Sequence, residues 1–121
     1  MPDERFTKAE RLRKRPEFRQ VYAAGRRYNL PLFTVFALPT PRGKTRLGVT
    51  VTKKIGRAVK RNRAKRLIRE VFRRNKNRIG GSFDLVVNVK DKLIEATYRE
   101  VEADFLTFIA RLRKDYRSEV S

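Results

Sequence analysis

A basic segment at residues 53–76 is the feature of this sequence that most constrains its fold. The segment holds twelve Lys or Arg residues and one acidic residue, Glu70. Apolar side chains recur through it at the spacing of one helix face, at Ala64, Leu67, Ile68, Val71 and Phe72. Polar and basic side chains gather on the opposite side of the same helix, at Asn62, Lys65, Arg66, Arg69 and Arg73. The segment therefore predicts an amphipathic helix over residues 58–74 that buries one side and presents cations on the other.

The charge of the whole chain supports the same interpretation. Its 121 residues include 32 Lys or Arg and 13 Asp or Glu, which gives a formal net charge of +19 and a pI of about 11.3. An ordinary solvated helix face mixes the two signs, because like charges one turn apart destabilise a helix. An anionic partner relieves such repulsion. We therefore interpret the basic face as a nucleic-acid binding surface rather than as an ordinary solvated face.

Residue types that are missing exclude several kinds of chemistry. The chain has no Cys, which excludes a disulfide framework, a thiolate nucleophile and cysteine-ligated zinc. It also has no His, the commonest general base and neutral metal ligand. No apolar stretch approaches the ~18 residues of a membrane span, and residues 1–18 carry charges where a signal peptide needs an apolar core. We therefore expect a cytoplasmic protein, and its 40% of hydrophobic residues indicates a folded domain rather than a basic tail.

Two further helices are predicted on either side of the basic segment. Residues 16–24 have apolar side chains at helical spacing, with Pro16 in the first turn and Gly25 as a left-handed residue just past the end. Thr97 can cap a last helix. The core face of that helix is formed by Tyr98, Val101, Phe105, Phe108, Ile109 and Leu112.

Alternating patterns predict the strands. They occur at residues 32–38, 47–51 and 83–89, and residues 26–29 are a further candidate that periodicity alone does not decide. The order of helices and strands indicates a single α+β domain, residues 1–121, with its helices packed on one sheet. We expect flexible ends at residues 1–10 and 115–121.

Both duplex DNA and RNA are candidate partners for the basic helix. A helix rich in Arg and Asn can read bases in a DNA major groove. Proteins that do so usually bring a second, turn-coupled helix or dimer-forming heptads, and the sequence shows neither. A mixed sheet with aromatic side chains on a strand favours RNA, because unpaired bases can stack on the rings.

Residues 53–70 carry a resemblance to a known family. They read KKIGRAVKRNRAKRLIRE. This stretch closely resembles the signature of the bacterial ribonuclease P protein subunit, which is centred on Arg-Asn-Arg. Residues 12–22 with Gly25 resemble the family's opening helix, and residues 46–51 and 83–87 resemble the strands that flank the signature. The resemblance covers nearly the whole chain, in order and at matching spacing.

The resemblance implies a fold and an activity. The family fold is an α/β sandwich similar to the second domain of a small-subunit ribosomal protein, with an unusual left-handed crossover through the signature helix. The family's activity is that of an endoribonuclease, which removes the 5′ leader of precursor transfer RNA by hydrolysing a phosphodiester. An RNA subunit that uses Mg²⁺ is the catalyst, and the protein binds both this RNA and the leader.

The same resemblance implies what the chain binds. Its expected partners are the catalytic RNA and precursor transfer RNA, with no membrane and no obligatory protein partner. The protein alone is expected to hold no cofactor or metal and to have no catalytic residues, whereas the ribonucleoprotein requires Mg²⁺. The absence of His agrees with a protein that is not itself the catalyst.

Individual residues take their expected roles from the motif positions. Those expected to face the catalytic RNA are Lys53, Arg57, Arg61, Asn62, Arg63, Lys65, Arg66 and Arg69. Those expected to line a leader-binding cleft between the first helix and the sheet are Phe18, Tyr22, Thr34 and Phe36, with Lys53 and Lys54 near the phosphate path. Plain core packing is the alternative for the three aromatic residues. Residues assigned to the core alone are Val21, Leu67, Ile68, Val71, Phe105 and Ile109.

Three other functions compete with this one. A ribosomal or ribosome-assembly protein is equally small and basic, and the long signature is what separates the two classes. A nuclease that acts alone needs converging carboxylates for Mg²⁺, and the sequence offers only the pairs Asp91 with Glu95 and Glu100 with Asp104. A DNA architectural protein would bind duplex DNA of any sequence with comparable affinity.

Overall fold

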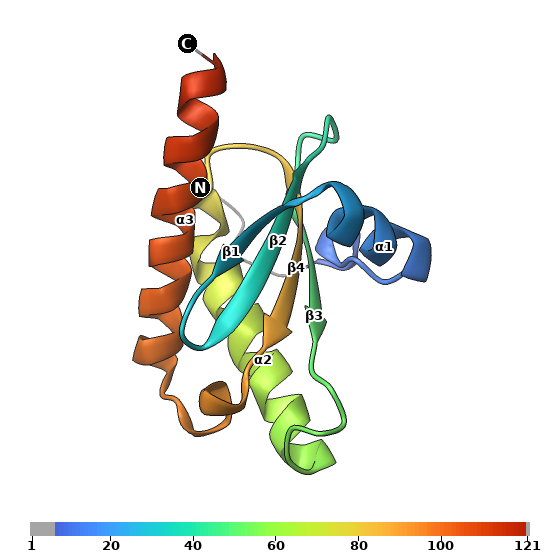
Figure 1. Ribbon diagram of the computed structural model, residues 1–121, viewed down its shortest axis with the longest axis vertical. Helices are drawn as coiled ribbons and strands as arrows, with labels where there is room; N and C mark the ends of the chain where they lie inside the picture. The colour runs from blue at the N-terminus through green and yellow to red at the C-terminus, as the bar shows by residue number, and fades with distance from the viewer. Residues whose placement is uncertain (1–6, 121) are drawn as a thin grey trace.

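The computed structural model describes residues 7–120 and arranges them around one four-stranded sheet (Figure 1). The strands are β1 (Arg26–Asn29), β2 (Phe33–Pro39), β3 (Arg46–Thr50) and β4 (Phe83–Val89), in the order β1-β2-β4-β3. Strand β2 is antiparallel to both β1 and β4, whereas β3 and β4 are parallel. The three predicted strands are confirmed, and the undecided segment 26–29 is a strand at one edge of the sheet.

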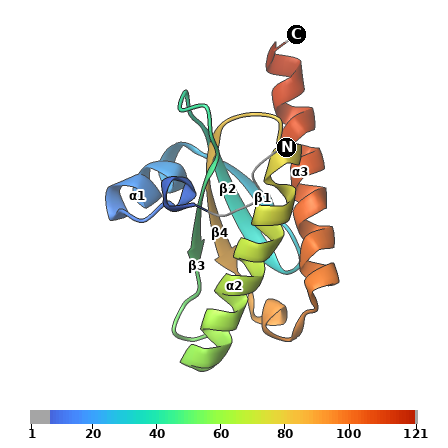
Figure 2. The same cartoon turned by 180° about the vertical axis from the view of Figure 1, so that it is seen from behind.

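Helices cover both faces of this sheet (Figure 2). Helix α1 (Arg15–Ala24) packs on one face, and α2 (Ala58–Asn75) and α3 (Tyr98–Val120) pack on the other. Short 3-10 turns, η1 (Lys8–Glu10), η2 (Lys76–Arg78) and η3 (Asp91–Glu95), join these elements. The predicted α+β class and all three predicted helices are confirmed.

The connection from β3 through α2 to β4 is left-handed. Strands β3 and β4 are parallel neighbours, and α2 lies between them in the chain. In Figure 2, α2 lies in front of the sheet, both strands point down, and β4 stands to the right of β3. Nearly all connections of this type are right-handed. The crossover that the family resemblance implied is therefore present, although general folding rules predict its mirror image.

Two hydrophobic cores lie on the two faces of the sheet. The larger core lies under α2 and α3 and includes the fully buried rings of Phe33, Phe72, Phe105 and Phe108. The smaller core lies under α1. It consists of buried Leu12, Val21 and Val86 with half-buried Phe18, Phe36 and Leu38 packed against them. Because successive strand residues point to opposite faces, Val86 and Val87 belong to different cores.

The ends of two helices test predictions made for single residues. The predicted cap of α3 is confirmed, because Thr97 Oγ1 accepts a hydrogen bond from the Glu100 N–H (3.2 Å) and Glu100 returns one to the Thr97 N–H (2.9 Å). The predicted left-handed conformation of Gly25 is wrong, because its φ is −77°. A Cβ at Gly25 would lie 2.5 Å from the Val21 carbonyl oxygen. Glycine is therefore required there by close packing and not by backbone conformation.

Regular structure reaches further toward both ends than the sequence predicted. Within the ends expected to be flexible, residues 8–10 form η1 and α3 continues to Val120. Residues 1–6 and 121 lie outside the described part of the chain. Between residues 7 and 120, no helix is both long and apolar enough to cross a membrane.

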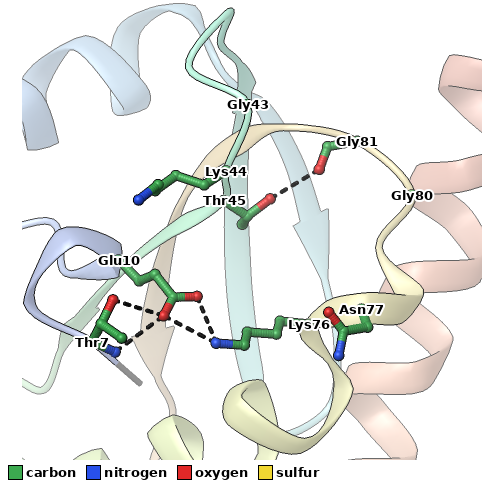
Figure 3. Close-up of a pocket in the computed structure, with 9 residues that line it drawn as sticks. All are labelled: Thr7, Glu10, Gly43, Lys44, Thr45, Lys76, Asn77, Gly80 and Gly81. Carbon is green, nitrogen blue, oxygen red and sulfur yellow. Dashed lines mark hydrogen bonds and ion pairs between the residues drawn. The ribbon is translucent and has the colours of Figure 1, made fainter. Parts of the chain in front are cut away.

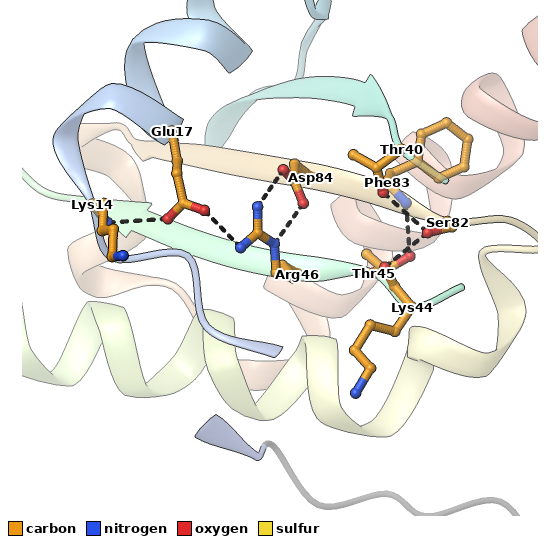
Figure 4. A network of polar contacts seen from close by, with 9 residues as sticks. All are labelled: Lys14, Glu17, Thr40, Lys44, Thr45, Arg46, Ser82, Phe83 and Asp84. Atoms are coloured by element: carbon orange, nitrogen blue, oxygen red, sulfur yellow. Dashed lines mark hydrogen bonds and ion pairs between the residues drawn. The ribbon is translucent and has the colours of Figure 1, made fainter. Parts of the chain in front are cut away.

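A buried ion-pair network fixes α1 to the sheet (Figure 4). The Arg46 guanidinium donates two hydrogen bonds to the Asp84 carboxylate, from Nε to Oδ1 (2.9 Å) and from Nη2 to Oδ2 (2.7 Å). Its Nη1 donates to Glu17 Oε2 in the first turn of α1 (2.7 Å). Hydrogen bonding to Asp84, with the further bond to Glu17, raises the pKa of Arg46 despite its burial. Burial raises the pKa of Glu17, but the bond and charge of Arg46 outweigh that effect and lower it. Arg46 and Glu17 are therefore charged, and their ion pair, together with the bonds from Arg46 to Asp84, sets the position of α1.

Candidate nucleic-acid interface

The outer side of α2 forms a basic hollow, called the α2 hollow below. Its volume is about 380 Å³, and its lining is Arg11, Asn62, Lys65, Arg66, Arg69, Glu70 and Arg73. Four residues that the sequence assigned to the catalytic RNA therefore lie together, namely Asn62, Lys65, Arg66 and Arg69. Arg11 comes from a distant part of the chain, and the sequence did not identify it.

The α2 hollow keeps an excess of positive charge. Its single carboxylate, Glu70, accepts hydrogen bonds from Arg73 Nε (3.2 Å) and Arg74 Nε (2.9 Å), and bonding to Arg73 is the largest cause of its lowered pKa. Burial, together with the nearby charge of Arg11, lowers the pKa of Arg69. Arg66 forms no hydrogen bond or ion pair within residues 7–120. The cations therefore repel one another, and an added anion would be stabilised there.

The two arginines of the Arg-Asn-Arg motif do not line the α2 hollow and instead bind backbone carbonyls of neighbouring loops. Arg61 Nη1 donates to the backbone carbonyls of Gly56 (2.7 Å) and Lys53 (3.4 Å). Arg63 donates to the carbonyl of Ile94 through Nη1 (3.0 Å) and, more weakly, to that of Ala96 through Nη2 (3.4 Å). Both side chains therefore fasten loops beside the start of α2, and neither lines the α2 hollow.

The loop before α2 carries the remaining basic residues of the signature. Lys53, Lys54 and Arg57 are exposed, whereas Ile55 is buried and anchors the loop. Gly56 has a positive φ of 61°, a conformation that other residues rarely adopt. Together with the bond from Arg61, this turn displays three cations at the beginning of α2.

Tyr22 and Phe36 form an aromatic surface on the other face of the sheet. Their ring centroids are 4.9 Å apart in an edge-to-face arrangement. Tyr22 is 38% exposed, and its hydroxyl donates a hydrogen bond to Asn88 Oδ1 (2.8 Å). The exposed ring of Tyr22, packed against half-buried Phe36, can stack with unpaired bases. Asn88 was missed from the sequence, although the alternation of strand 83–89 places it on the face opposite Leu85 and Val87.

The other residues predicted to line the cleft differ from Tyr22. Phe18 is half-buried in the smaller core, and a Cβ at Gly48 would lie 2.5 Å from its ring, so its packing on the sheet is tight. Thr34 is buried, and its hydroxyl donates to Asn29 Oδ1 (3.0 Å). Lys54 is exposed in the loop after β3 and forms no hydrogen bond with these side chains.

Comparisons with known proteins agree with this geometry. The family model described as ribonuclease P matches residues 6–113. A ribonuclease P protein component from Syntrophus aciditrophicus is 48% identical over 94 residues, which cover 78% of this chain and 79% of that protein. The component from Thermotoga maritima is 39% identical over 109 residues, with 90% and 91% coverage.

Solved structures show the same fold. The ribonuclease P protein from Thermotoga maritima superimposes with a TM-score of 0.77 at 35% identity, covering 84% of this chain and 96% of that one. The protein from Staphylococcus aureus gives a TM-score of 0.76 at 30% identity, with 88% and 97% coverage. A basic α2 surface, a left-handed crossover and these matches lead to one conclusion: the chain belongs to the ribonuclease P protein family.

Proposed function

We propose that this chain binds the catalytic RNA of ribonuclease P through α2 and the loop before it. The observation that carries the proposal is the α2 hollow, where cations from two parts of the chain converge around one already paired carboxylate. Phosphate oxygens are the natural partners of clustered guanidinium groups, which bind them by charge-assisted hydrogen bonds. Residues proposed to contact this RNA directly are Lys53, Arg57, Asn62, Lys65, Arg66 and Arg69, whereas Arg61 and Arg63 act by holding loops in place.

We further propose that the aromatic surface binds the 5′ leader of precursor transfer RNA. Tyr22 and Phe36 offer ring faces and edges to unpaired nucleotides, and stacking tolerates the differing sequences of leaders. Phe18 supports this surface from below by packing α1 on the sheet, and Thr34 lies buried beside it. Lys54 supplies positive charge near the start of α2 for the leader's phosphates.

Chemistry is assigned to the RNA subunit. Mg²⁺ bound by the ribonucleoprotein would supply the chemistry that hydrolyses the precursor's phosphodiester, and we propose that the complex acts in the cytoplasm. Of the two carboxylate pairs that the sequence offered, one serves the fold: Glu100 caps α3, and Asp104 accepts a hydrogen bond from the Leu32 N–H (2.9 Å). The protein contributes positive charge, which replaces part of the screening that the folded RNA needs.

Cleavage of precursor transfer RNA by the cognate catalytic RNA at near-physiological Mg²⁺ tests this function. Cleavage should be restored when the chain is added, and the chain alone should not cleave. A variant that lacks two cations of the α2 hollow, Arg66→Ala with Arg69→Ala, should restore cleavage only at higher protein concentration. Steady hydrolysis by protein freed of RNA, or no effect of the chain on the RNA's activity, would contradict the proposal.

A further inference from the structure

Residues 7–12, called the N-terminal strap below, lie outside the signature and yet contribute to the α2 hollow. Arg11 of the strap lines the hollow with Arg66 and Arg69 of α2. Its charge is close enough to lower the pKa of Arg69. A residue far from the signature in sequence therefore takes part in the basic surface of α2.

The strap is held on both sides of Arg11. On one side, Leu12 is buried, and its N–H donates to the Leu47 carbonyl at the edge strand β3 (2.9 Å). On the other side, Glu10 accepts hydrogen bonds from the Lys76 ammonium at both carboxylate oxygens (3.0 and 2.8 Å), as Figure 3 shows. Thr7 adds its N–H (3.0 Å) and hydroxyl (2.9 Å) to the same carboxylate. Arg11 is thus fixed between two attachments.

The ion pair between Glu10 and Lys76 is well shielded from water. Their side chains are only 12% and 10% exposed. Burial raises the pKa of Glu10, but the hydrogen bonds from Lys76 and Thr7 outweigh it, so the net effect is a lowered pKa and a charged carboxylate. The pair joins the strap to η2, directly after the end of α2. It therefore sets where Arg11 lies relative to Arg69 and Arg73.

We propose that the strap is part of the RNA-binding surface, with Arg11 contacting the phosphate backbone in the α2 hollow and Glu10 acting as the positioning residue for Arg11. The inference rests on the proposed function, because the RNA it concerns is the catalytic RNA. Arg11 lies close enough to the α2 arginines for its charge to lower the pKa of Arg69, and the Glu10–Lys76 pair holds the strap beside them. A phosphate group bound between Arg11 and the α2 arginines is attracted by all of these cations and reduces the repulsion among them.

Replacing an acidic residue provides a sharp test. Glu10→Gln raises the net charge by one unit, so charge alone predicts tighter RNA binding. The proposal predicts the reverse, about threefold weaker binding to the cognate catalytic RNA, because the attachment at Leu12 then holds Arg11 without the ion pair at Glu10. Glu95→Gln is the matched control, since Glu95 is exposed and forms no hydrogen bond or ion pair within residues 7–120. That variant should bind as tightly as the wild type or more tightly.

Variants of Arg11 complete the test. Arg11→Ala should weaken binding about tenfold and lower the salt dependence by roughly one phosphate contact. Arg11→Lys should recover part of this loss. Glu10→Gln combined with Arg11→Ala should bind no more weakly than Arg11→Ala alone, because Glu10 acts through Arg11. Melting temperatures of all variants are measured beside the affinities.

Each result supports or overturns the inference. If wild-type protein binds the RNA and Arg11→Ala binds equally well, the strap is not part of the surface and the inference alone is wrong. Two results would overturn the positioning role of Glu10. The first is a double variant whose loss of RNA affinity equals the sum of the losses in Glu10→Gln and Arg11→Ala; the second is Glu10→Gln binding RNA as tightly as Glu95→Gln. If wild-type protein fails to bind the RNA, the proposed function itself is wrong.

Discussion

Replacing Arg46 by methionine tests the network that holds α1 on the sheet. The Arg46 side chain is 10% exposed and makes three hydrogen bonds of 2.7–2.9 Å to two carboxylates. Methionine fills a similar volume and provides no donor. The Arg46→Met variant therefore leaves Asp84, whose side chain is 7% exposed, without its bidentate partner, and it frees Glu17 from the sheet.

The expected loss of stability is large for a domain of this size. Removing one member of a buried ion pair costs about 3–5 kcal/mol, mainly because the remaining charge stays buried and unpaired. A domain of 121 residues has a total stability of about 5–15 kcal/mol. One kcal/mol corresponds to roughly 3–5 °C of melting temperature at this length, so we expect a decrease of roughly 10–20 °C.

Thermal and urea unfolding of Arg46→Met beside the wild type measures this loss. Arg19→Met is the matched control, because Arg19 is exposed on α1 and forms no ion pair within the described residues, and its effect should stay within about 0.5 kcal/mol. Arg46→Met combined with Asp84→Leu should be more stable than Arg46→Met alone, since the unpaired carboxylate is gone. An unchanged melting temperature for Arg46→Met would refute the reasoning, as would a double variant less stable than the single one.

The same network predicts a pH dependence. The pKa of Glu17 is lower in the folded protein than its ordinary value of 4.5. A lowered folded-state pKa contributes stability that is present above pH 4.5 and is lost as the pH falls through the folded-state value. The stability difference between wild type and Arg46→Met should therefore narrow as the pH decreases below about 4.5.

Two further predictions separate binding from structural roles. Arg66→Ala and Arg69→Ala should weaken binding to the catalytic RNA by about 1–3 kcal/mol while the melting temperature holds or rises, because like-charge crowding is relieved. Arg61→Ala and Arg63→Ala should lower the melting temperature as well, since they remove hydrogen bonds to loop carbonyls. An unfolded Arg66→Ala protein would show that Arg66 has a structural role and would contradict this prediction. Phe18→Ala should cost about 2–4 kcal/mol of folding stability, whereas Tyr22→Ala should mainly weaken binding of precursors with a leader and spare mature transfer RNA. Equal effects of both aromatic variants on melting temperature would place Tyr22 in the core instead.

Local patterns were sufficient to predict most of the architecture. The spacing of Leu67, Ile68 and Val71 identified the buried side of α2, and alternation identified β4, because both depend only on neighbours in the chain. The cap at Thr97 followed from the same kind of information, since its partner Glu100 is three residues away. The gathering of Asn62, Lys65, Arg66 and Arg69 on one side of α2 was predicted by helical geometry alone.

Features that depend on distant parts of the chain could not be predicted in this way. Helical geometry places Arg63 on the surface of α2, but its acceptors are carbonyls of Ile94 and Ala96, which only the tertiary fold brings near. The place of Arg11 beside Arg69 likewise depends on the attachment of Glu10 to Lys76. Gly25 was misassigned for a related reason, because its requirement comes from close packing against the Val21 carbonyl and the Ala37 backbone.

Helix α2 is folded in the free protein despite its one-sided charge, so its basic surface is already ordered before RNA binds. Each like-charge pair one turn apart costs about 0.2–0.5 kcal/mol. Burial of Ile68, Val71 and Phe72 contributes about 1.5–3 kcal/mol for each side chain and outweighs several such pairs. The larger core therefore stabilises the helix from one side while repulsion remains on the other. A bound RNA reduces the repulsion among these cations. Because the helix is already ordered, little of the binding free energy is lost to folding it.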